Sequence, residues 1–168
     1  MIDMLSFFKL QDGTNKKRIF FLVLMALMLI SGALLFNSPG QTQVITVKFP
    51  NGSFLKSEVA DTPEKLLFGL AFRPSLPEDE AMLYIFGESG LHRVWTKEFQ
   101  FPVDVIWVDE SKIVVHLEKD VPPCSQNPCT WYGPPPNDAR YILEANAGFI
   151  NREKVAIGNQ LKFALFIP

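Results

Sequence analysis

The chain has 168 residues, a formal net charge of -2 and 48% hydrophobic residues. This length gives room for one globular domain rather than two. From residue 41 onward the chain carries 12 Lys and Arg against 16 Asp and Glu. Nucleic-acid binding needs the opposite excess, because contacts with phosphate are made by a basic surface. We therefore expect no nucleic acid among its partners.

An uncharged apolar run extends from Ile19 to Phe36, directly after the basic triplet Lys16-Lys17-Arg18. At about 1.5 Å per residue, a helix over this run is roughly 27 Å long, close to the hydrocarbon thickness of a bilayer. Basic residues before such a helix favour a cytoplasmic N-terminus. The sequence predicts a cytoplasmic tail over residues 1–18, a transmembrane anchor over 19–36, a linker over 37–42 and an extracytoplasmic domain over 43–168.

A cleaved signal peptide is the alternative interpretation of the same run. Ser31 and Ala33 offer a small-x-small cleavage pattern, but the apolar residues continue beyond it to Phe36. We therefore favour a retained anchor. The expected location is the cell membrane, with a single pass and the C-terminal domain in a periplasm or outside the cell.

Seven or eight short strand-like runs follow, separated by turn residues. They cover residues 44–49, 53–60, 82–86, 91–95, 103–109, 113–118, 140–145 and 161–167. Pro50-Asn51-Gly52 predicts a hairpin between the first two runs, and Asp109-Glu110-Ser111 predicts one between the fifth and sixth. Residues 87–90 are expected to form a turn, and residues 120–138 a long proline-rich loop.

Only short helices are expected beside these strands. Thr62 as N-cap, Pro63 at the first helical position and Glu64 in the first turn predict a helix to about Phe72. Residues 147–153 suggest one further helical turn. The sequence shows no strand–helix–strand alternation. The predicted fold is mainly β, a small irregular β-sandwich or barrel with one or two short helices.

Several sequence blocks resemble the DUF192 (UPF0127) domain of bacteria and archaea. They include Gly69-Leu70-x-Phe72-Arg73, Arg93-x-Trp95-x-Lys97, Pro102-x-Asp104 and Leu143-Glu144-x-Asn146-Ala147-Gly148. The blocks fall in family order and spacing over about residues 44–163. The resemblance implies a compact mainly β domain, often exported behind a signal peptide or anchor, with no established activity. This copy departs from the family where Thr96, Glu98 and Phe99 replace the usual Met, Asn and Thr.

Two acids, Asp104 and Glu144, lie within apolar strand-like runs. A carboxylate on an apolar face is unfavourable unless it is paired or hydrogen-bonded. One interpretation is an internal ion-pair cluster with the available cations Arg93, Lys97 and Arg140. The other is a ligand pocket, whose candidate residues are Arg93, Trp95, Lys97, Asp104 and Glu144.

Cys124 and Cys129 are the only cysteines and lie in the proline-rich loop. In an exported domain the oxidising surroundings favour a disulfide between them. Their spacing is not C-x-x-C, which disfavours redox catalysis. A metal site that added His92 or His116 would draw its ligands from three separate segments. We expect neither a metal nor a cofactor.

No catalytic signature stands out in the sequence. Gly87-Glu88-Ser89-Gly90 lacks the G-x-S-x-G spacing of a nucleophile elbow. The leading hypothesis is a membrane-anchored extracytoplasmic domain that binds a small ligand or an envelope partner without catalysis. One alternative is an envelope hydrolase that uses Asp104 and Glu144. Another is a scaffold for other membrane proteins, which acts through the membrane tether and the proline-rich loop that carries Trp131 and Tyr132.

Overall fold

The computed structural model describes residues 16–29, residue 31 and residues 42–165. Residues 16–29 are helical. Among the described residues, no helix combines the length and the apolar character needed to cross a bilayer. The expected tail, anchor and linker over residues 1–42 lie partly outside the described residues, so they remain expectations.

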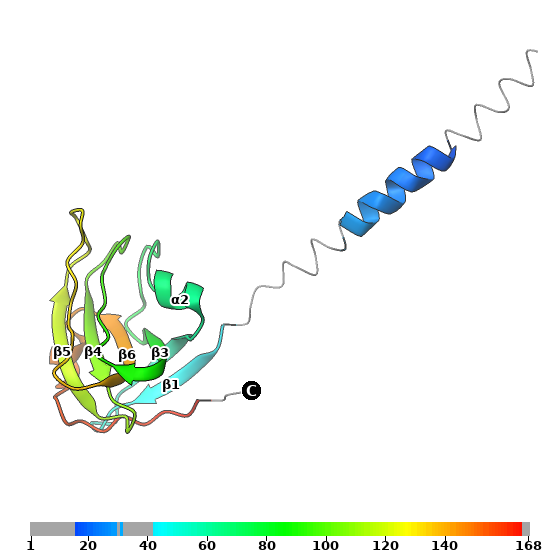
Figure 1. Cartoon of the computed structure of the whole chain (residues 1–168). Coiled ribbons are helices and arrows are strands. Elements are labelled where there is room, and N and C mark those ends of the chain that lie inside the picture. Colours follow the sequence, from blue (N-terminus) through cyan, green and yellow to red (C-terminus); the bar gives the residue numbers. More distant parts are fainter. Residues whose placement is uncertain (1–15, 30, 32–41, 166–168) are drawn as a thin grey trace, which may run out of the picture. The chain divides into compact units, whose positions relative to one another are not determined.

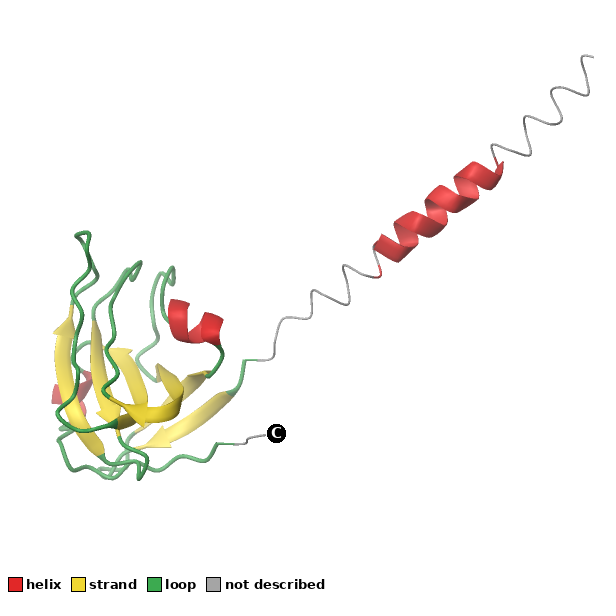
Figure 2. Ribbon diagram, in the orientation of Figure 1, coloured by secondary structure: helices red, strands yellow, loops and turns green. Residues whose placement is uncertain are grey.

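Residues 42–168 form a compact unit, whose described part holds one six-stranded sheet (Figures 1 and 2). The strands are β1 Val44–Lys48, β2 Phe54–Ala60, β3 Glu80–Gly90, β4 Val103–Val108, β5 Val114–Val121 and β6 Ala139–Asn146. The helices of this unit are α2 Pro63–Phe68 and α3 Phe149–Glu153. The expectation of a mainly β domain with one or two short helices is confirmed.

The strand order is β1-β2-β3-β6-β4-β5. All neighbours are antiparallel except β2 and β3, which run parallel on either side of α2 in the chain. The expectation that the chain has no strand–helix–strand unit is therefore wrong. The unit escaped notice because α2 has only six residues and a long loop follows it. Both predicted hairpins, β1–β2 and β4–β5, are confirmed.

The described part of the chain has six strands rather than seven or eight. Residues 87–90 belong to β3 instead of forming a turn, and the β3–β6 register shifts between Ile85 and Gly90. Such an irregularity is typical of a strand that contains glycine. In the predicted strand over residues 91–95, Val94 makes only an isolated bridge with Tyr132.

The predicted closing strand over residues 161–167 is also not a strand in its described part. The C-terminal segment instead contacts both edges of the sheet. Lys162 exchanges two backbone hydrogen bonds with Lys48 of β1. At the other edge, the Val114 N–H of β5 donates to the Asn159 carbonyl. The segment thus bridges the sheet edges into an irregular barrel without a continuous ladder.

Hydrophobic cores lie on both faces of the sheet, because neighbouring residues of β3, β4 and β6 alternate between them. The inner core contains Ala81, Leu83, Ile106, Val108, Leu143 and Ala145, covered by α3 and the C-terminal segment. The outer core contains Met82, Tyr84, Val103, Val105, Trp107 and Ile142, covered by Leu70, Leu76, Val94 and Phe99. Since the central strands are covered on both sides, they read as nearly continuous apolar runs.

Helix α2 begins as predicted, with the Thr62 hydroxyl accepting a hydrogen bond from the Lys65 N–H and with Pro63 at the first position. It ends at Phe68 rather than near Phe72, because Gly69 takes a positive φ of 49° and terminates it. None of its residues is buried. Its apolar side chains therefore lie partly exposed on the outer side of the sheet.

Asp104 of β4 is fully buried and faces the inner core side. Its two carboxylate oxygens accept hydrogen bonds from the Asp120 N–H at 2.8 Å and the Ile150 N–H at 2.7 Å. Ile150 is in the first turn of α3, where backbone N–H groups lack helical partners. The N-cap of α3 is Gly148, which has no side chain that could accept a hydrogen bond from these N–H groups. Asp104 therefore caps α3 from a neighbouring strand.

We predict that Asp104→Ala lowers the free energy of unfolding by about 3 kcal/mol or more. The variant removes the acceptor of one buried hydrogen bond, from the Ile150 N–H, and of one partly buried hydrogen bond, from the Asp120 N–H. Asp104→Asn should lose less, since its amide oxygen still accepts one of the two bonds. Urea denaturation of both variants measures the difference. Glu110→Ala, at an exposed position, serves as the control and should change stability by less than about 0.5 kcal/mol. Equal stabilities for Asp104→Ala and the control would contradict this capping role.

Candidate functional site

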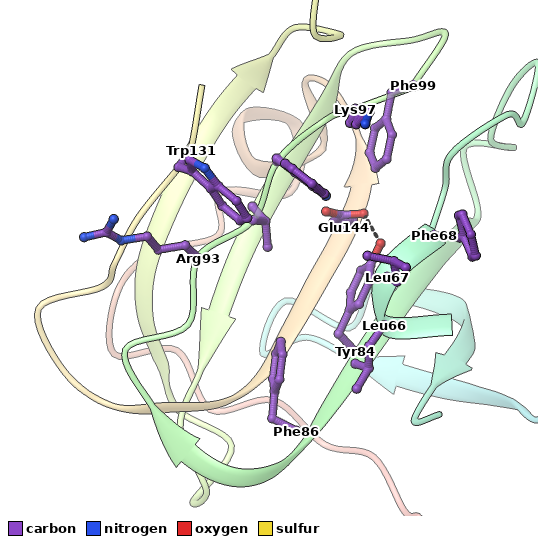
Figure 3. Close-up of a pocket in the computed structure, with 12 residues that line it drawn as sticks. Leu66, Leu67, Phe68, Tyr84, Phe86, Arg93, Lys97, Phe99, Trp131 and Glu144 are labelled. Carbon is purple, nitrogen blue, oxygen red and sulfur yellow. Dashed lines mark hydrogen bonds between the residues drawn. The ribbon is translucent and has the colours of Figure 1, made fainter. Parts of the chain in front are cut away.

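A pocket of about 160 Å³ opens on the outer side of the sheet (Figure 3). Its floor comes from β3 and β6, one wall from α2, and the opposite wall from residues 93–99 and 131. The lining residues are Leu66, Leu67, Phe68, Tyr84, Phe86, Arg93, Val94, Trp95, Lys97, Phe99, Trp131 and Glu144. The lining is thus mostly apolar and aromatic, which is the usual character of a small-molecule site.

Glu144 of β6 forms the polar floor of the pocket and is only 1% exposed. The Tyr84 hydroxyl of β3 donates a hydrogen bond of 2.7 Å to Glu144 Oε2, as Figure 3 shows. Tyr84 is itself buried. Two polar side chains thus share a hydrogen bond beneath an apolar chamber.

Gly69, the residue that ends α2, makes room for the Tyr84 hydroxyl. A Cβ added at Gly69 would lie 1.8 Å from Tyr84 Oη, and the positive φ of 49° further disfavours a side chain. The same glycine therefore terminates α2 and lets the phenol reach Glu144. This links the helix end to the floor of the pocket.

Burial raises the pKa of Glu144 from 4.5 to about 7, and the hydrogen bond from Tyr84 opposes this effect. Removing a carboxylate from water penalises its charged form. Burial, together with the neighbouring Glu144, also raises the pKa of Tyr84 well above its ordinary value. Tyr84 thus remains a protonated donor at neutral pH, while Glu144 is present in both forms.

Aromatic rings form the wall opposite α2. Trp95 and Trp131 stack with ring centroids 4.6 Å apart and planes inclined by 17°. Lys97 Nζ lies 5.6 Å from the centroid of the Trp95 ring, a distance at which a cation is attracted to the ring face. Arg93 and Lys97 are exposed at the mouth. The mouth is therefore basic while the floor is acidic.

The structure brings four of the five predicted site residues together around this pocket, and it places Asp104 elsewhere. Asp104 pairs with Ala145, whereas Glu144 pairs with the neighbouring Val105. Paired residues share a sheet face, and successive residues point to opposite faces. The two carboxyl groups therefore lie on opposite sides of the sheet. This arrangement does not let them act together on one bond.

The alternative of an internal ion-pair cluster is not what the side chains form. Asp104 is satisfied by backbone N–H groups and Glu144 by a phenol. Within the described residues, the ion pairs involve other acids and bases. Arg140 donates to the Gly87 carbonyl instead. Hydrogen bonding, rather than ion pairing, makes the burial of both acids tolerable.

The predicted disulfide between Cys124 and Cys129 is confirmed. Its loop is attached to the segment that carries Lys97, because the Cys124 N–H donates to the Thr96 carbonyl. The Thr96 hydroxyl donates in turn to the Pro122 carbonyl at 2.8 Å. The disulfide loop thus supports the pocket wall from behind.

Sequence reasoning missed most of the apolar lining and the partner of Glu144. Tyr84 lies 60 residues from Glu144 in the chain, and only the pairing of β3 with β6 brings them together. A polar aromatic residue in the apolar run 82–86 was the available signal. Trp131 entered the predictions only through the scaffold hypothesis, because its stacking on Trp95 depends on the tertiary fold.

We predict that Glu144 makes the domain less stable as the pH rises. Because the pKa is higher in the folded state, the folded form keeps its proton where the unfolded form has lost it, between about pH 4.5 and 7. The ionisation of Glu144 therefore does not change the free energy of unfolding below pH 4.5, and it lowers this free energy by about 3 kcal/mol above pH 7. The free energy of urea unfolding, measured from pH 4 to 8, should therefore fall more steeply than in Glu144→Gln. Parallel curves for the two proteins would refute it.

Comparison with known proteins places this geometry in a family. The sequence profile of the DUF192 family, described as "Uncharacterized ACR", matches residues 46–163. A crystal structure from Sinorhizobium meliloti 1021, of a protein described as a candidate transcription regulator, aligns with a TM-score of 0.64 at 24% identity. That alignment covers 73% of this chain and 95% of the other.

A protein of unknown function from Novosphingobium aromaticivorans DSM 12444 aligns with the same TM-score of 0.64 at 23% identity, over 74% of this chain and 89% of its own. These two likenesses show a shared fold. No curated protein matches the sequence. The family match covers more than two thirds of the residues and includes the strands and loops that build the pocket. The chain belongs to the DUF192 family.

Proposed function

We propose that this domain binds a small molecule in the pocket above Glu144, without catalysing its conversion. The observation that carries the proposal is a buried carboxyl group at the floor of an open, mostly apolar chamber. Buried polar groups usually have all their hydrogen bonds made within the protein. Among the described residues, the Glu144 carboxyl group has one hydrogen-bond partner, the Tyr84 hydroxyl. A group held in this way remains able to bind a ligand.

The size of the chamber supports a small ligand. A cavity of about 150 Å³ is large enough to hold benzene, and this one measures about 160 Å³. Its walls would therefore enclose a single ring or a short branched chain. A larger molecule would extend from the mouth between α2 and Trp131.

The chemistry of the lining favours binding over catalysis. Among the described lining residues, the ionisable groups are one carboxyl, one phenol and two exposed cations. The phenol stays protonated because burial raises its pKa, and Asp104 lies on the opposite face of the sheet. A hydrolase with two cooperating carboxylates therefore lacks its second group here. Trp131, central to the scaffold hypothesis, lines the pocket wall, which favours a role in ligand binding.

We further propose that the domain is extracytoplasmic and is held at the membrane by residues 19–36. Support comes from the uncharged apolar run and the three basic residues before it. The Cys124–Cys129 disulfide is a second argument, because disulfides persist in oxidising compartments and are rare in the cytosol. The bound molecule would then be one present in the cell envelope or the medium.

We expect an alkaline phosphatase fused after Pro168 of the full chain to be active in bacterial cells, because that enzyme needs an oxidising compartment. The fusion should remain in the membrane fraction after an alkaline carbonate wash. A matched fusion that lacks residues 1–41 should be inactive and soluble. Activity of the full fusion in the washed supernatant would indicate a cleaved signal peptide, and its inactivity would rule out export.

We also expect small apolar molecules such as toluene or benzyl alcohol to shift the indole N–H signals of Trp95 and Trp131 in NMR spectra. The signal of Trp107 should stay unchanged, because Trp107 does not line the pocket and its indole N–H donates to the His92 carbonyl. Leu66→Trp should fill the chamber and abolish the shifts. Leu91→Trp, at an exposed position outside the lining, is the matched control. Shifts that survive Leu66→Trp would argue against this pocket.

A further inference from the structure

The mouth of the pocket presents positive charge without acidic partners. Lys97 and Arg93 both line the pocket. Among the described residues neither forms an ion pair, although six such pairs occur elsewhere. Figure 3 shows the Arg93 side chain extending away from Glu144, so Lys97 is the cation better placed to act within the chamber. Its flexible stem lets the ammonium group move toward a bound anion.

The floor presents an oxygen that the protein does not use. The Tyr84 hydroxyl binds Oε2 of Glu144, and no described group binds Oε1. Ser57 Oγ is the one fully buried side-chain polar atom without a partner in the described part of the chain. Glu144 Oε1 also lacks a partner, so it is not fully buried. Because Glu144 lines the pocket, a ligand in the chamber can reach this oxygen. In the neutral form of Glu144 this oxygen is free to carry the proton and to donate it to a ligand.

Apolar side chains surround the same mouth and are largely exposed. Leu67 is 59%, Phe68 52% and Trp131 51% exposed. The first two belong to α2, which buries none of its residues. When a ligand covers this apolar surface, binding is favoured by about 25 cal/mol for each Å² of surface removed from water. The pocket thus suits a molecule with an apolar body and one charged end.

We propose that the ligand is a small carboxylate with an apolar body. Its carboxylate accepts a hydrogen bond from protonated Glu144 and pairs with Lys97, while its body lies between α2 and Trp131. This inference rests on the proposed binding function of the pocket. The opposite polarity, an amine on ionised Glu144, would bring a cation into a chamber whose mouth already carries Lys97 and Arg93.

The charged groups around Glu144 give this binding a definite pH dependence. Tyr84 faces it from β3, and Lys97 and Arg93 lie on the opposite wall. Arg73 lies near Tyr84 and opposes the rise in the pKa of this phenol. Met82 and Val105, which pair with Glu144 on the two neighbouring strands, are apolar. Because Glu144 is the group that changes its charge near neutral pH, a carboxylate ligand should bind more weakly as the pH rises.

The test compares three probes of one size and different charge: 4-methylbenzoate, 4-methylbenzyl alcohol and 4-methylbenzylamine. Isothermal titration uses residues 42–168, the compact unit that holds both hydrophobic cores. At pH 6 we expect the benzoate to bind at least tenfold more tightly than the alcohol, and the amine to bind weakest. Between pH 6 and pH 8 the benzoate should lose about tenfold in affinity.

Two variants separate the contributions. Lys97→Gln should weaken benzoate binding about tenfold and leave the alcohol unchanged. Lys48→Gln, on the exposed side of β1, is the matched control and should alter neither. Glu144→Gln keeps a donor at the floor, so it should retain benzoate binding and lose the pH dependence. The two pocket variants act at different places, so a folding defect in one leaves the other informative.

The outcomes distinguish this inference from the proposed function. Equal affinities for the three probes, or tightest binding of the amine with affinity rising with pH, would overturn the carboxylate and leave a binding pocket. Absence of binding by all three probes, without shifts of the Trp95 and Trp131 signals, would overturn both.

Discussion

Coverage of the central strands on both faces is the constraint on which this structure depends. Residues 81–84 of β3, 103–108 of β4 and 141–145 of β6 are all buried, on either the inner or the outer side of the sheet. Moving one residue along such a stretch therefore changes the surroundings of a side chain completely. A polar side chain within these stretches cannot avoid burial. Its role depends on the hydrogen-bond donors that the covering segment on that side supplies, and these donors differ between the two buried acids.

Asp104 faces the inner core, where the start of α3 and the end of β5 supply two backbone N–H groups. Its carboxylate is fully used and holds secondary structure together. Glu144 faces the outer core, where its described partner is a phenol and the space above it is open. The first carboxyl group is therefore structural, and the second is available for binding.

The outer side differs from the inner side because its cover is incomplete. On the inner side, α3 and the C-terminal segment bury Phe149, Ile150 and Leu161 against the sheet. On the outer side, α2 ends after six residues at Gly69 and leaves its apolar residues partly exposed. The gap between α2 and the stacked Trp95–Trp131 pair is the pocket. A chamber of this kind is retained at some loss of stability, and pKa elevation of Glu144 by burial is one sign of that loss.

The sequence by itself determined the mainly β composition, the two hairpins, the start of α2, the disulfide and the family, because these depend on short-range patterns of turns, caps, apolar runs and motif blocks. It also marked Asp104 and Glu144 as acids that required an explanation. It did not reveal the parallel β2–β3 pair, the bridging by residues 158–162 or the meeting of Tyr84 with Glu144. Those features join residues far apart in the chain, and only strand order and register decided which acid would be consumed as a cap and which would face an open chamber.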